Sequence, residues 1–325
     1  MQAVICTQYG APDVLQLQTV EKPVPAPNEV LIKVRAATAT TAGLAGRKGR
    51  PLFARLFSGL TKPKKNILGS ELAGEVVAAG RDVTEFEIGD HIFGTTAASL
   101  GAHAEYVALS KDLALTHKPS NLNFVEAAAV VEGGLTAVHF LKNKVTIQPG
   151  QNVLINGASG AVGTAAVQIA KLFGATVTGV CSGANVDMVR RLGADEVIDY
   201  TKEDFVENGR YYDIIFDTVG KRSYSQCKES LTPNGIYLDA GSAMTLFPML
   251  WTSLFGRKKA ILATTYVRPA SEIKKDLIYL KALVEADQFK PVIDRCYPLA
   301  ETANAHRYVE TERKKGNVII TVVEG

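Results

Sequence analysis

A glycine-rich turn between an apolar run and a helical pattern constrains the fold of this chain more than any other feature. The apolar run spans residues 152–155 (NVLI), and the turn follows at 156–163 (NGASGAVG). Apolar side chains then recur at helical spacing as far as Phe173, and Gly174 stands where a helix C-cap is expected. A strand, a glycine turn and a helix in this order predict the first βα unit of a doubly wound parallel sheet.

The spacing of the turn is that of a dinucleotide-binding fingerprint. Ala158, Gly160 and Gly163 stand at the A-x-G-x-x-G positions. Gly160 would let the main chain approach a pyrophosphate, Gly163 would let the helix pack on the sheet, and the helix N-terminus supplies unpaired N–H groups. The alternatives are a turn that only packs tightly and the cofactor loop of a methyltransferase. The strand and helix on either side favour a dinucleotide.

Strand and helix alternate after this turn. We expect strands at residues 176–181, 196–198, 213–217 and 235–238, and helices at 186–192 and 221–230. Repeated βα units of this length predict a parallel sheet covered on both faces.

The first third of the chain has a different character. Short apolar runs at residues 30–34, 73–77 and 91–93 are divided by Gly, Pro and Asn, which predicts an irregular, barrel-like β unit. A helix is expected at 271–288 and a strand at 317–323, and we expect this tail to return to the first unit.

Length and composition exclude several classes of protein. The 325 residues suit two domains, since a domain usually has ~100–200 residues. A net charge of +3 indicates no nucleic-acid partner. The four cysteines form no CxxC pair, which argues against a zinc ribbon and a disulfide framework and favours a reducing compartment. With no signal peptide in view, we expect a cytoplasmic protein.

The end of the second expected strand bears on the choice of dinucleotide. NAD-selective sites place an Asp or Glu there for the ribose hydroxyls. Here residues 181–185 are CSGAN, and the first acid is Asp187. The Ser182 hydroxyl could hydrogen-bond a 2′-phosphate, although no Arg or Lys follows at once, and Ser182 could instead cap a helix. We therefore expect NADP(H) to be preferred over NAD(H).

A series of motifs in fixed order carries a family resemblance along nearly the whole chain. They stand at residues 9–15 (YGAPDVL), 28–34 (NEVLIKV), 68–76 (LGSELAGEV), 88–90 (IGD), 104–106 (AEY), 126–129 (EAAA), 134–137 (GLTA), 157–163 (GASGAVG), 192–200 (LGADEVIDY) and 216–220 (FDTVG). With these motifs the chain resembles the zinc-independent quinone oxidoreductase branch of the medium-chain dehydrogenase/reductase superfamily.

This resemblance implies an α/β protein of two domains. A GroES-like β-rich substrate domain would comprise residues 1–122 and 288–325, and a Rossmann dinucleotide-binding domain residues 123–287. It also implies hydride transfer from a nicotinamide cofactor, commonly NADPH, to small molecules: quinones, enones or alkenals. The alternatives are a zinc-free alcohol or aldehyde reductase and a nucleotide-binding module that senses NADPH without turnover.

The resemblance also assigns residues to the cofactor. They are Thr136 near the nicotinamide, Ser159, Gly160, Ala161, Val162 and Gly163 under the pyrophosphate, Ser182 and Tyr200 at the adenosine ribose or its phosphate, and Gly241 and Ser242 near the nicotinamide ribose. Thr136 could instead cap or pack within its helix, and Tyr200 could be an ordinary aromatic residue at a strand end.

Zinc-dependent relatives bind a catalytic metal through an early Cys and the His of a Gly-His-Glu motif. Here residues 37–43 (ATATTAG) lack Cys, and the motif is Gly69-Ser70-Glu71. Zinc requires three or four N, S or O ligands, so we predict no metal.

Thr40 is the candidate hydrogen-bond donor to the carbonyl oxygen of an enone, where it would stabilise the forming enolate. A hydroxyl is a poor sole proton source, so water or the cofactor ribose would supply the proton. Many relatives have Asn at the place of Thr40 and Asp at the place of Gly43, so the substrate contacts differ here. The alternative is a buried strand residue whose hydroxyl bonds its own backbone.

Two segments combine basic and apolar residues. Residues 47–65 contain seven Lys or Arg and no acid, and residues 244–259 contain the single tryptophan, Trp251, and end in three basic residues. A basic amphipathic helix can lie on an anionic membrane, which would give a weak surface contact. We favour instead a lid over the substrate cleft and a subunit contact in a homodimer.

Overall fold

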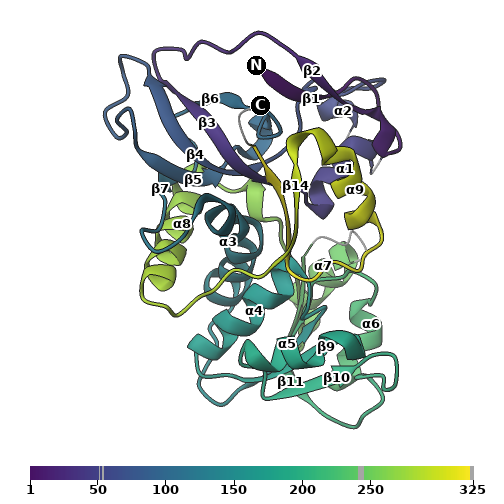
Figure 1. Ribbon diagram of the computed structural model, residues 1–325. Coiled ribbons are helices and arrows are strands. Elements are labelled where there is room, and N and C mark those ends of the chain that lie inside the picture. The colour runs from purple at the N-terminus through teal and green to yellow at the C-terminus, as the bar shows by residue number, and fades with distance from the viewer. Residues whose placement is uncertain (51, 53–54, 241–244, 323–325) are drawn as a thin grey trace. The chain divides into compact units, whose positions relative to one another are not determined.

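The computed structural model describes residues 1–50, 52, 55–240 and 245–322. It divides into two compact units, a β-rich unit of Met1–Glu132 with Pro269–Gly325 and a nucleotide unit of Gly133–Arg268 (Figure 1). This confirms the expected α/β class, with a Rossmann sheet and a GroES-like β-rich part.

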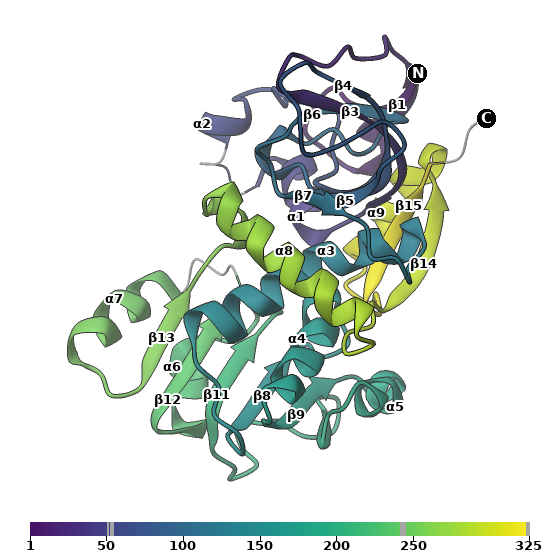
Figure 2. The same cartoon turned by 90° about the vertical axis from the view of Figure 1, so that its left-hand side faces the viewer.

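The nucleotide unit contains a six-stranded sheet in which every neighbouring pair of strands is parallel. Its strands are β8 (Asn152–Asn156), β9 (Thr176–Cys181), β10 (Glu196–Asp199), β11 (Tyr212–Asp217), β12 (Leu231–Asp239) and β13 (Lys259–Leu262), and its helices are α4 (Ala161–Leu172), α5 (Val186–Arg191), α6 (Tyr224–Cys227) and α7 (Leu246–Phe255). The spatial order is β10-β9-β8-β11-β12-β13, the Rossmann order, and Figure 2 shows α7 beside β13.

The strands of this sheet are apolar because both faces are covered. Val153, Leu154 and Ile155 of β8 are fully buried. A cluster on the sheet joins Leu154 to Val180, Ile215 and other buried side chains. The runs that predicted β8 to β12 are therefore strands of one core, whereas β13 was not expected.

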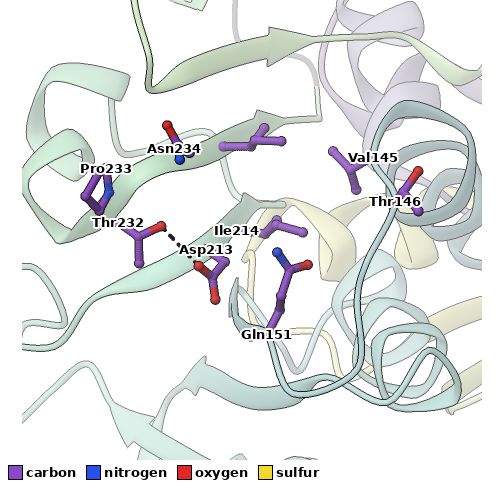
Figure 3. A pocket seen from close by; sticks show the side chains of 9 residues that line it. Val145, Thr146, Gln151, Asp213, Ile214, Thr232, Pro233 and Asn234 are labelled. Carbon is purple, nitrogen blue, oxygen red and sulfur yellow. Dashed lines mark hydrogen bonds between the residues drawn. The ribbon is translucent and has the colours of Figure 1, made fainter.

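A pocket of about 350 Å³ lies at the amino ends of the central strands (Figure 3). Its lining includes Gln151 before β8, Asp213 in β11 and Thr232 in β12. The Asp213 carboxylate accepts hydrogen bonds from Thr232 Oγ1 at 3.1 Å and from the Asn152 N–H at 2.9 Å. Ligands of open α/β sheets bind at the opposite, carboxyl edge, so this pocket is not the expected cofactor site.

The β-rich unit contains a seven-stranded sheet and a separate two-stranded one. Its strands are β1 (Gln2–Cys6), β2 (Leu15–Thr19), β3 (Glu29–Thr38), β4 (Glu71–Ala79), β5 (His91–Thr95), β6 (Tyr106–Ser110), β7 (Leu115–His117), β14 (Ile293–Pro298) and β15 (Asn317–Thr321). The larger sheet has the order β14-β15-β3-β4-β5-β7, and β6 also pairs with β3. Since β15 pairs antiparallel with β3, with Ile319 opposite Thr38, the expected return of the tail is confirmed.

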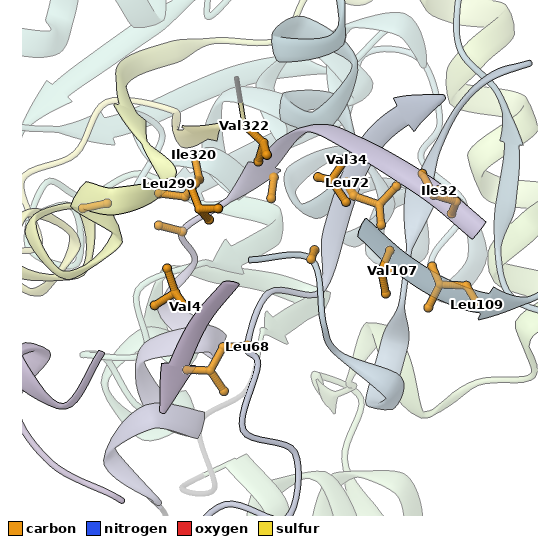
Figure 4. Close-up of a cluster of buried hydrophobic side chains, with 14 of the residues drawn as sticks. Val4, Ile32, Val34, Leu68, Leu72, Val107, Leu109, Leu299, Ile320 and Val322 are labelled. Atoms are coloured by element: carbon orange, nitrogen blue, oxygen red, sulfur yellow. The ribbon is translucent and has the colours of Figure 1, made fainter. Parts of the chain in front are cut away.

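The core of this unit brings both ends of the chain together (Figure 4). Val4 of β1, Ile32 of β3 and Leu72 of β4 pack in one cluster with Leu299 and Ile320 from the C-terminal part. Val4 and Ile320 stand 316 residues apart in the sequence, and burial of their apolar surface holds the two ends of the chain together. Such burial contributes about 25 cal/mol per Å².

Helices complete the β-rich unit: α1 (Thr41–Lys48), α2 (Arg55–Ser58), α8 (Ala270–Glu285), α9 (Thr302–Glu310) and the first part of α3 (Phe124–Val138). The sequence interpretation instead placed residues 123–287 in the nucleotide domain. Helix α8 belongs with the β-rich strands because it contacts β7 and because Asn121 Nδ2 donates to the Val284 carbonyl at 2.8 Å.

The helical stretch Phe124–Lys144 is long and apolar enough to cross a bilayer, but 78% of its most apolar window is buried inside the protein. A core helix of a water-soluble protein has the same length and composition.

A buried polar cluster in the β-rich unit makes its stability depend on pH. His103 and His306 face each other with ring centroids 5.8 Å apart, and both ring nitrogens of His306 lack a hydrogen-bond partner within the described part of the chain. Burial, with the His103 and Arg47 charges, lowers the pKa of His306 to about 2, and burial also lowers the pKa of His103.

We therefore expect the free energy of unfolding to fall as the pH decreases below 6.5. The folded protein keeps His306 neutral, whereas the unfolded chain takes up a proton below the ordinary pKa of 6.5. This uptake costs about 1.4 kcal/mol per pH unit for each such histidine, and the stability is fully present above pH 6.5. Urea unfolding of the native protein and of His306→Gln between pH 7 and pH 5 tests this, since the variant should show a shallower slope; equal slopes would contradict it.

Candidate dinucleotide site

The candidate site lies where the strand order of the nucleotide unit reverses, at the carboxyl ends of β8 and β11. Dinucleotides bind at this switch point in open α/β sheets, because the adjacent crossovers leave the sheet in opposite directions and open a crevice. The predicted turn, Gly157 to Gly163, follows β8 directly and leads into α4. The sequence and the topology therefore place the same residues at this edge.

Hydrogen bonds hold the turn against the neighbouring strand. The Gly157 and Ala158 N–H groups both donate to the Val180 carbonyl of β9, at 3.1 and 2.9 Å. Gly157 has φ +83°, a left-handed conformation that favours glycine, and a Cβ there would lie 2.5 Å from a methyl carbon of Val219. The turn is thus fixed in shape before any ligand binds.

Gly160 and Gly163 are required for different reasons. A Cβ on Gly163 would lie 2.1 Å from the Gly157 carbonyl oxygen, so this glycine is imposed by packing of α4 on the turn. A Cβ on Gly160 would meet nothing closer than that same oxygen at 3.5 Å, an ordinary contact. The protein itself leaves the space beside Gly160 free, as expected where the main chain approaches a ligand closely.

The amino end of α4 suits an anion. Gly160 is its N-cap without a side-chain cap, and the first turn carries no acidic residue. The first N–H groups of a helix have no partner within it and carry a partial positive charge. The other predicted pyrophosphate residues, Ser159, Ala161 and Val162, flank Gly160 in the chain, and the N–H groups at this helix end are of the kind that binds a phosphate group.

Asp217 links the strands at the carboxyl edge of the sheet by hydrogen bonds. The carboxylate, at the end of β11, is buried and accepts hydrogen bonds from Asn156 Nδ2, the Val219 and Gly220 N–H groups and the Tyr237 hydroxyl, at 2.9–3.1 Å. It joins β8, β11, β12 and the following turn. Our sequence interpretation included Asp217 in a family motif but gave it no role; a buried acid at a strand end was the available signal.

The predicted adenosine residues lie together at the ends of β9 and β10. The Tyr200 N–H donates to the Cys181 carbonyl at 3.1 Å, which brings Tyr200 beside Ser182, and the Tyr200 side chain is 63% exposed. Ser182 occupies the N-cap position of a short 3-10 turn but makes no cap bond; its hydroxyl accepts from Asn185 Nδ2 at 3.1 Å. Ser182 Oγ–H can therefore still donate to a ligand.

A carboxylate that sequence reasoning missed shares this place. Asp199, the last residue of β10, extends over Gly183, where a Cβ would lie 2.6 Å from Asp199 Oδ2. Hydrogen bonds from the side chain and the main chain of Thr201 lower the pKa of Asp199, so it is ionised at neutral pH. The acid that binds the ribose usually follows the second strand of the sheet, whereas Asp199 ends the third, so the sequence rule did not identify it.

Thr136 lies in α3 with its side chain buried, and Thr265 Oγ1 donates to Thr136 Oγ1 at 3.1 Å. Thr265 follows β13, an element that the sequence did not predict, so this partner was missed as well. Gly241 and Ser242 lie outside the described residues.

Thr40 belongs to the β-rich unit, where it is buried as the N-cap of α1. Its Oγ1 accepts a hydrogen bond from the Gly43 N–H at 2.9 Å, so the hydroxyl proton remains available for donation. The neighbouring Thr38 donates to the Glu71 carboxylate at 2.6 Å, and Ser70 Oγ donates to its other oxygen at 2.8 Å. Burial raises the pKa of the nearby Glu132 to about 7, and the charge of Glu71 acts in the same direction.

No group of three or more His, Cys, Asp or Glu side chains placed to hold a metal ion occurs among the residues the structure describes. Ser70 and Glu71, at the place of the Gly-His-Glu motif, bond to each other. Cys6, Cys181 and Cys227 are buried free thiols, and burial raises the pKa of Cys181 to about 11 and of Cys227 to about 12.

Two family descriptions match the chain. Residues 26–120 match the "Alcohol dehydrogenase GroES-like domain", and residues 192–320 match the "Zinc-binding dehydrogenase" family. The first match falls in the β-rich unit, and the second includes β10 to β13 of the nucleotide unit.

Similar proteins cover the chain from end to end. The chloroplastic quinone-oxidoreductase homolog of Spinacia oleracea is 31% identical over 334 residues, 98% of this chain and 98% of its own. The solved quinone oxidoreductase of Coxiella burnetii is 30% identical with a TM-score of 0.89, and 99% of each chain is covered. The Escherichia coli quinone oxidoreductase, solved in complex with NADPH, is 25% identical with a TM-score of 0.86, over 99% of this chain and all of the other.

Proposed function

Because this chain belongs to the quinone oxidoreductase branch of the medium-chain dehydrogenase/reductase superfamily, we propose that it is an NAD(P)H-dependent reductase of quinones or α,β-unsaturated carbonyl compounds. The observation that carries the proposal is the free space beside Gly160 at the amino end of α4. Gly163, in contrast, is explained by the packing of α4 on the turn. The NADPH complex of the E. coli relative supports the same class of cofactor.

In this proposal, residues of the nucleotide unit bind the cofactor, and Thr40 of the β-rich unit stabilises the charge that develops on the substrate. The α4 N-terminus and Gly160 bind the pyrophosphate, and Ser182 and Tyr200 bind the adenosine ribose. A reduced nicotinamide supplies a hydride when bound. Thr40 donates a hydrogen bond to the substrate carbonyl oxygen, where negative charge develops when the conjugated double bond is reduced.

We propose NADPH as the preferred cofactor, with a modest margin. The absence of an acid from residues 181–185 and the free Ser182 hydroxyl proton support a 2′-phosphate. The ionised Asp199 beside Gly183 opposes it, because two negative charges repel.

Replacing Asp199 should therefore increase the preference for NADPH. We expect Asp199→Asn to raise the ratio of kcat/KM for NADPH over NADH by about fivefold, because the variant no longer repels a 2′-phosphate. Asp187→Asn, which removes an exposed acid from the nearby α5, is the matched control and should leave the ratio unchanged. An unchanged ratio in Asp199→Asn would show that the 2′-phosphate of NADPH does not bind next to Asp199.

We also propose that catalysis needs no zinc and that the enzyme works in a reducing compartment such as the cytoplasm. Residues 37–43 offer no Cys ligand, and Ser70 replaces the His ligand of zinc-dependent relatives. The buried free thiols support the reducing compartment.

The test is a screen of NADPH oxidation over quinones, enones, alkenals and simple aldehydes. We expect oxidation only when a quinone or an enone is added, and full activity after dialysis against a chelator. Oxidation with aldehydes alone, with a C=O product, would favour an alcohol or aldehyde reductase. NADPH binding without turnover on any substrate would favour a sensor module.

A further inference from the structure

Glu132 is an acid of helix α3 that the proposed reaction has not used. Its side chain is half-buried, and its carboxyl oxygens accept no hydrogen bond and form no close ion pair with any residue that the structure describes. The buried Asp217, in contrast, accepts four hydrogen bonds. A carboxyl group that is withdrawn from water and left without a protein partner is available to a ligand, and such groups gather at functional sites.

The position of Glu132 in α3 is four residues before Thr136. Side chains at i and i+4 lie on the same face of a helix, one turn apart, so Glu132 and Thr136 share a face of α3. Thr136 is the residue expected near the nicotinamide, and its hydroxyl accepts a hydrogen bond from Thr265. The helix therefore carries an acid one turn from the place expected for the hydride source.

A second neighbour of Glu132 is Glu71 of β4, whose negative charge acts on it. Glu71 is buried, and its two oxygens accept hydrogen bonds from Thr38 Oγ1 at 2.6 Å and from Ser70 Oγ at 2.8 Å. Both Glu71 oxygens are thus occupied, whereas those of Glu132 are not. Thr38 ends β3 two residues before Thr40, and side chains at i and i+2 lie on the same side of an extended chain. The hydrogen bonds of Glu71 therefore connect the surroundings of Glu132 to the segment that carries Thr40.

Two charged groups act on Glu132: Glu71, and Lys314, which stands three residues before β15. Lys314 Nζ donates to the Gly316 carbonyl at 2.9 Å, and burial lowers the pKa of Lys314. Burial raises the pKa of Glu132 to about 7; the Lys314 charge opposes this shift, and the Glu71 charge adds to it. About half of the molecules therefore hold a neutral Glu132 at pH 7, and a general acid works best with a pKa near the working pH.

We propose that Glu132 is the general acid of enone reduction and gives its carboxyl proton to the α-carbon of the substrate. The substrate accepts a hydride at its β-carbon, and the electron pair of the C=C bond passes into an enolate, whose oxygen Thr40 holds by a hydrogen bond. The enolate pair then forms the C–H bond at the α-carbon as the Glu132 O–H bond breaks, and Glu132 regains a proton from water. This assignment rests on the proposed function, and it names a proton source that the Thr40 hydroxyl alone does not provide.

Glu132→Gln keeps nearly the same shape but has no acidic proton. We expect kcat for enone reduction to fall about 100-fold, the lower end of what a positioned general acid contributes. The native kcat should decline as the pH rises through about 7, because only the neutral carboxyl donates, and this decline should be absent from Glu132→Gln. Glu272→Gln, which changes an exposed acid in the first turn of α8, is the matched control and should keep the native rate and pH profile.

Three further measurements distinguish a catalytic from a structural role. The native protein should convert an α-methyl enone to a product of one configuration at the α-carbon, and Glu132→Gln should give a mixture, since water then protonates either face. Quinone reduction places its protons on oxygen atoms, which exchange rapidly with water, so the variant should keep most of its quinone activity. Carbon-13 NMR of glutamate-labelled native protein should show a carboxyl group that titrates near pH 7 and is missing from Glu132→Gln.

Native enone turnover in Glu132→Gln, or a decline above pH 7 that persists in this variant, would overturn the assignment. An equal loss of quinone and enone reduction, together with a lower melting temperature, would also overturn it and give Glu132 a structural role. A native protein that reduces neither enones nor quinones would overturn the proposed function itself, and this assignment with it.

Discussion

Gly160→Val should lose NADPH binding on the order of 100-fold, about 2.7 kcal/mol, while the protein stays folded. The Cβ at Gly160 meets only an ordinary contact within the protein, so the folded state tolerates the side chain. The added methyl groups instead occupy the space through which a pyrophosphate approaches the α4 N-terminus. Titration calorimetry with NADPH gives the affinity, and thermal unfolding shows that the fold is intact.

Gly163→Val is the matched substitution, with the opposite expectation. Its Cβ would lie 2.1 Å from the Gly157 carbonyl oxygen and 2.7 Å from the Ala158 Cα, both rigid main-chain atoms. Forced overpacking of this kind costs about 1–3 kcal/mol or more, so the melting temperature should fall. Unchanged NADPH affinity in Gly160→Val would contradict the assignment of this turn to the pyrophosphate.

Thr40→Val should lower kcat for enone reduction by about 10²–10³, the value of one positioned hydrogen-bond donor, and leave NADPH affinity unchanged. Valine has nearly the shape of threonine but can neither cap α1 nor donate a proton. Loss of the cap alone costs about 1 kcal/mol of stability, so steady-state kinetics must be accompanied by a melting curve.

Two further variants separate the cap from the donor. Thr40→Ser keeps both functions and should retain most of the activity. Thr40→Asp keeps the cap, since Asp caps helices as well as Ser does, but an ionised carboxylate donates no hydrogen bond and should be as slow as valine. If Thr40→Val turned over the enone at the native rate, the Thr40 hydroxyl would have no role in catalysis and would serve only as the N-cap of α1.

Local sequence patterns were sufficient to predict most of the fold. The runs before and after the glycine turn became β8, α4 and β9 because strand and helix periodicity agree there with a buried core. Strand β13 was missed because its four residues, Lys259–Leu262, continue a basic segment and have no alternation of their own. The pairing of β15 with β3 is a contact between distant segments, which no local pattern specifies.

The parts of the candidate site that depend on glycine in the main chain could be predicted from the sequence. The parts that depend on side chains from neighbouring strands could not. Gly163 is recognisable because packing of α4 on the turn leaves no room for a side chain, and Gly160 is recognisable because the proposed pyrophosphate contact requires a bare main chain. Asp199 lies one strand away from the position where the rule for ribose-binding acids applies, and Thr265, which bonds Thr136, follows the unexpected β13. Their roles depend on which strands are neighbours, which is a tertiary property.

The most direct test of the proposed reaction uses NADPH in which both hydrogens at C4 of the nicotinamide are replaced by deuterium, with an enone as substrate and NMR of the product. We expect deuterium on the former β-carbon and a hydrogen from solvent on the α-carbon, because reduction of the conjugated C=C delivers hydride to the first and a proton to the second. Deuterium on a carbinol carbon, or a product without deuterium, would contradict the proposed reduction.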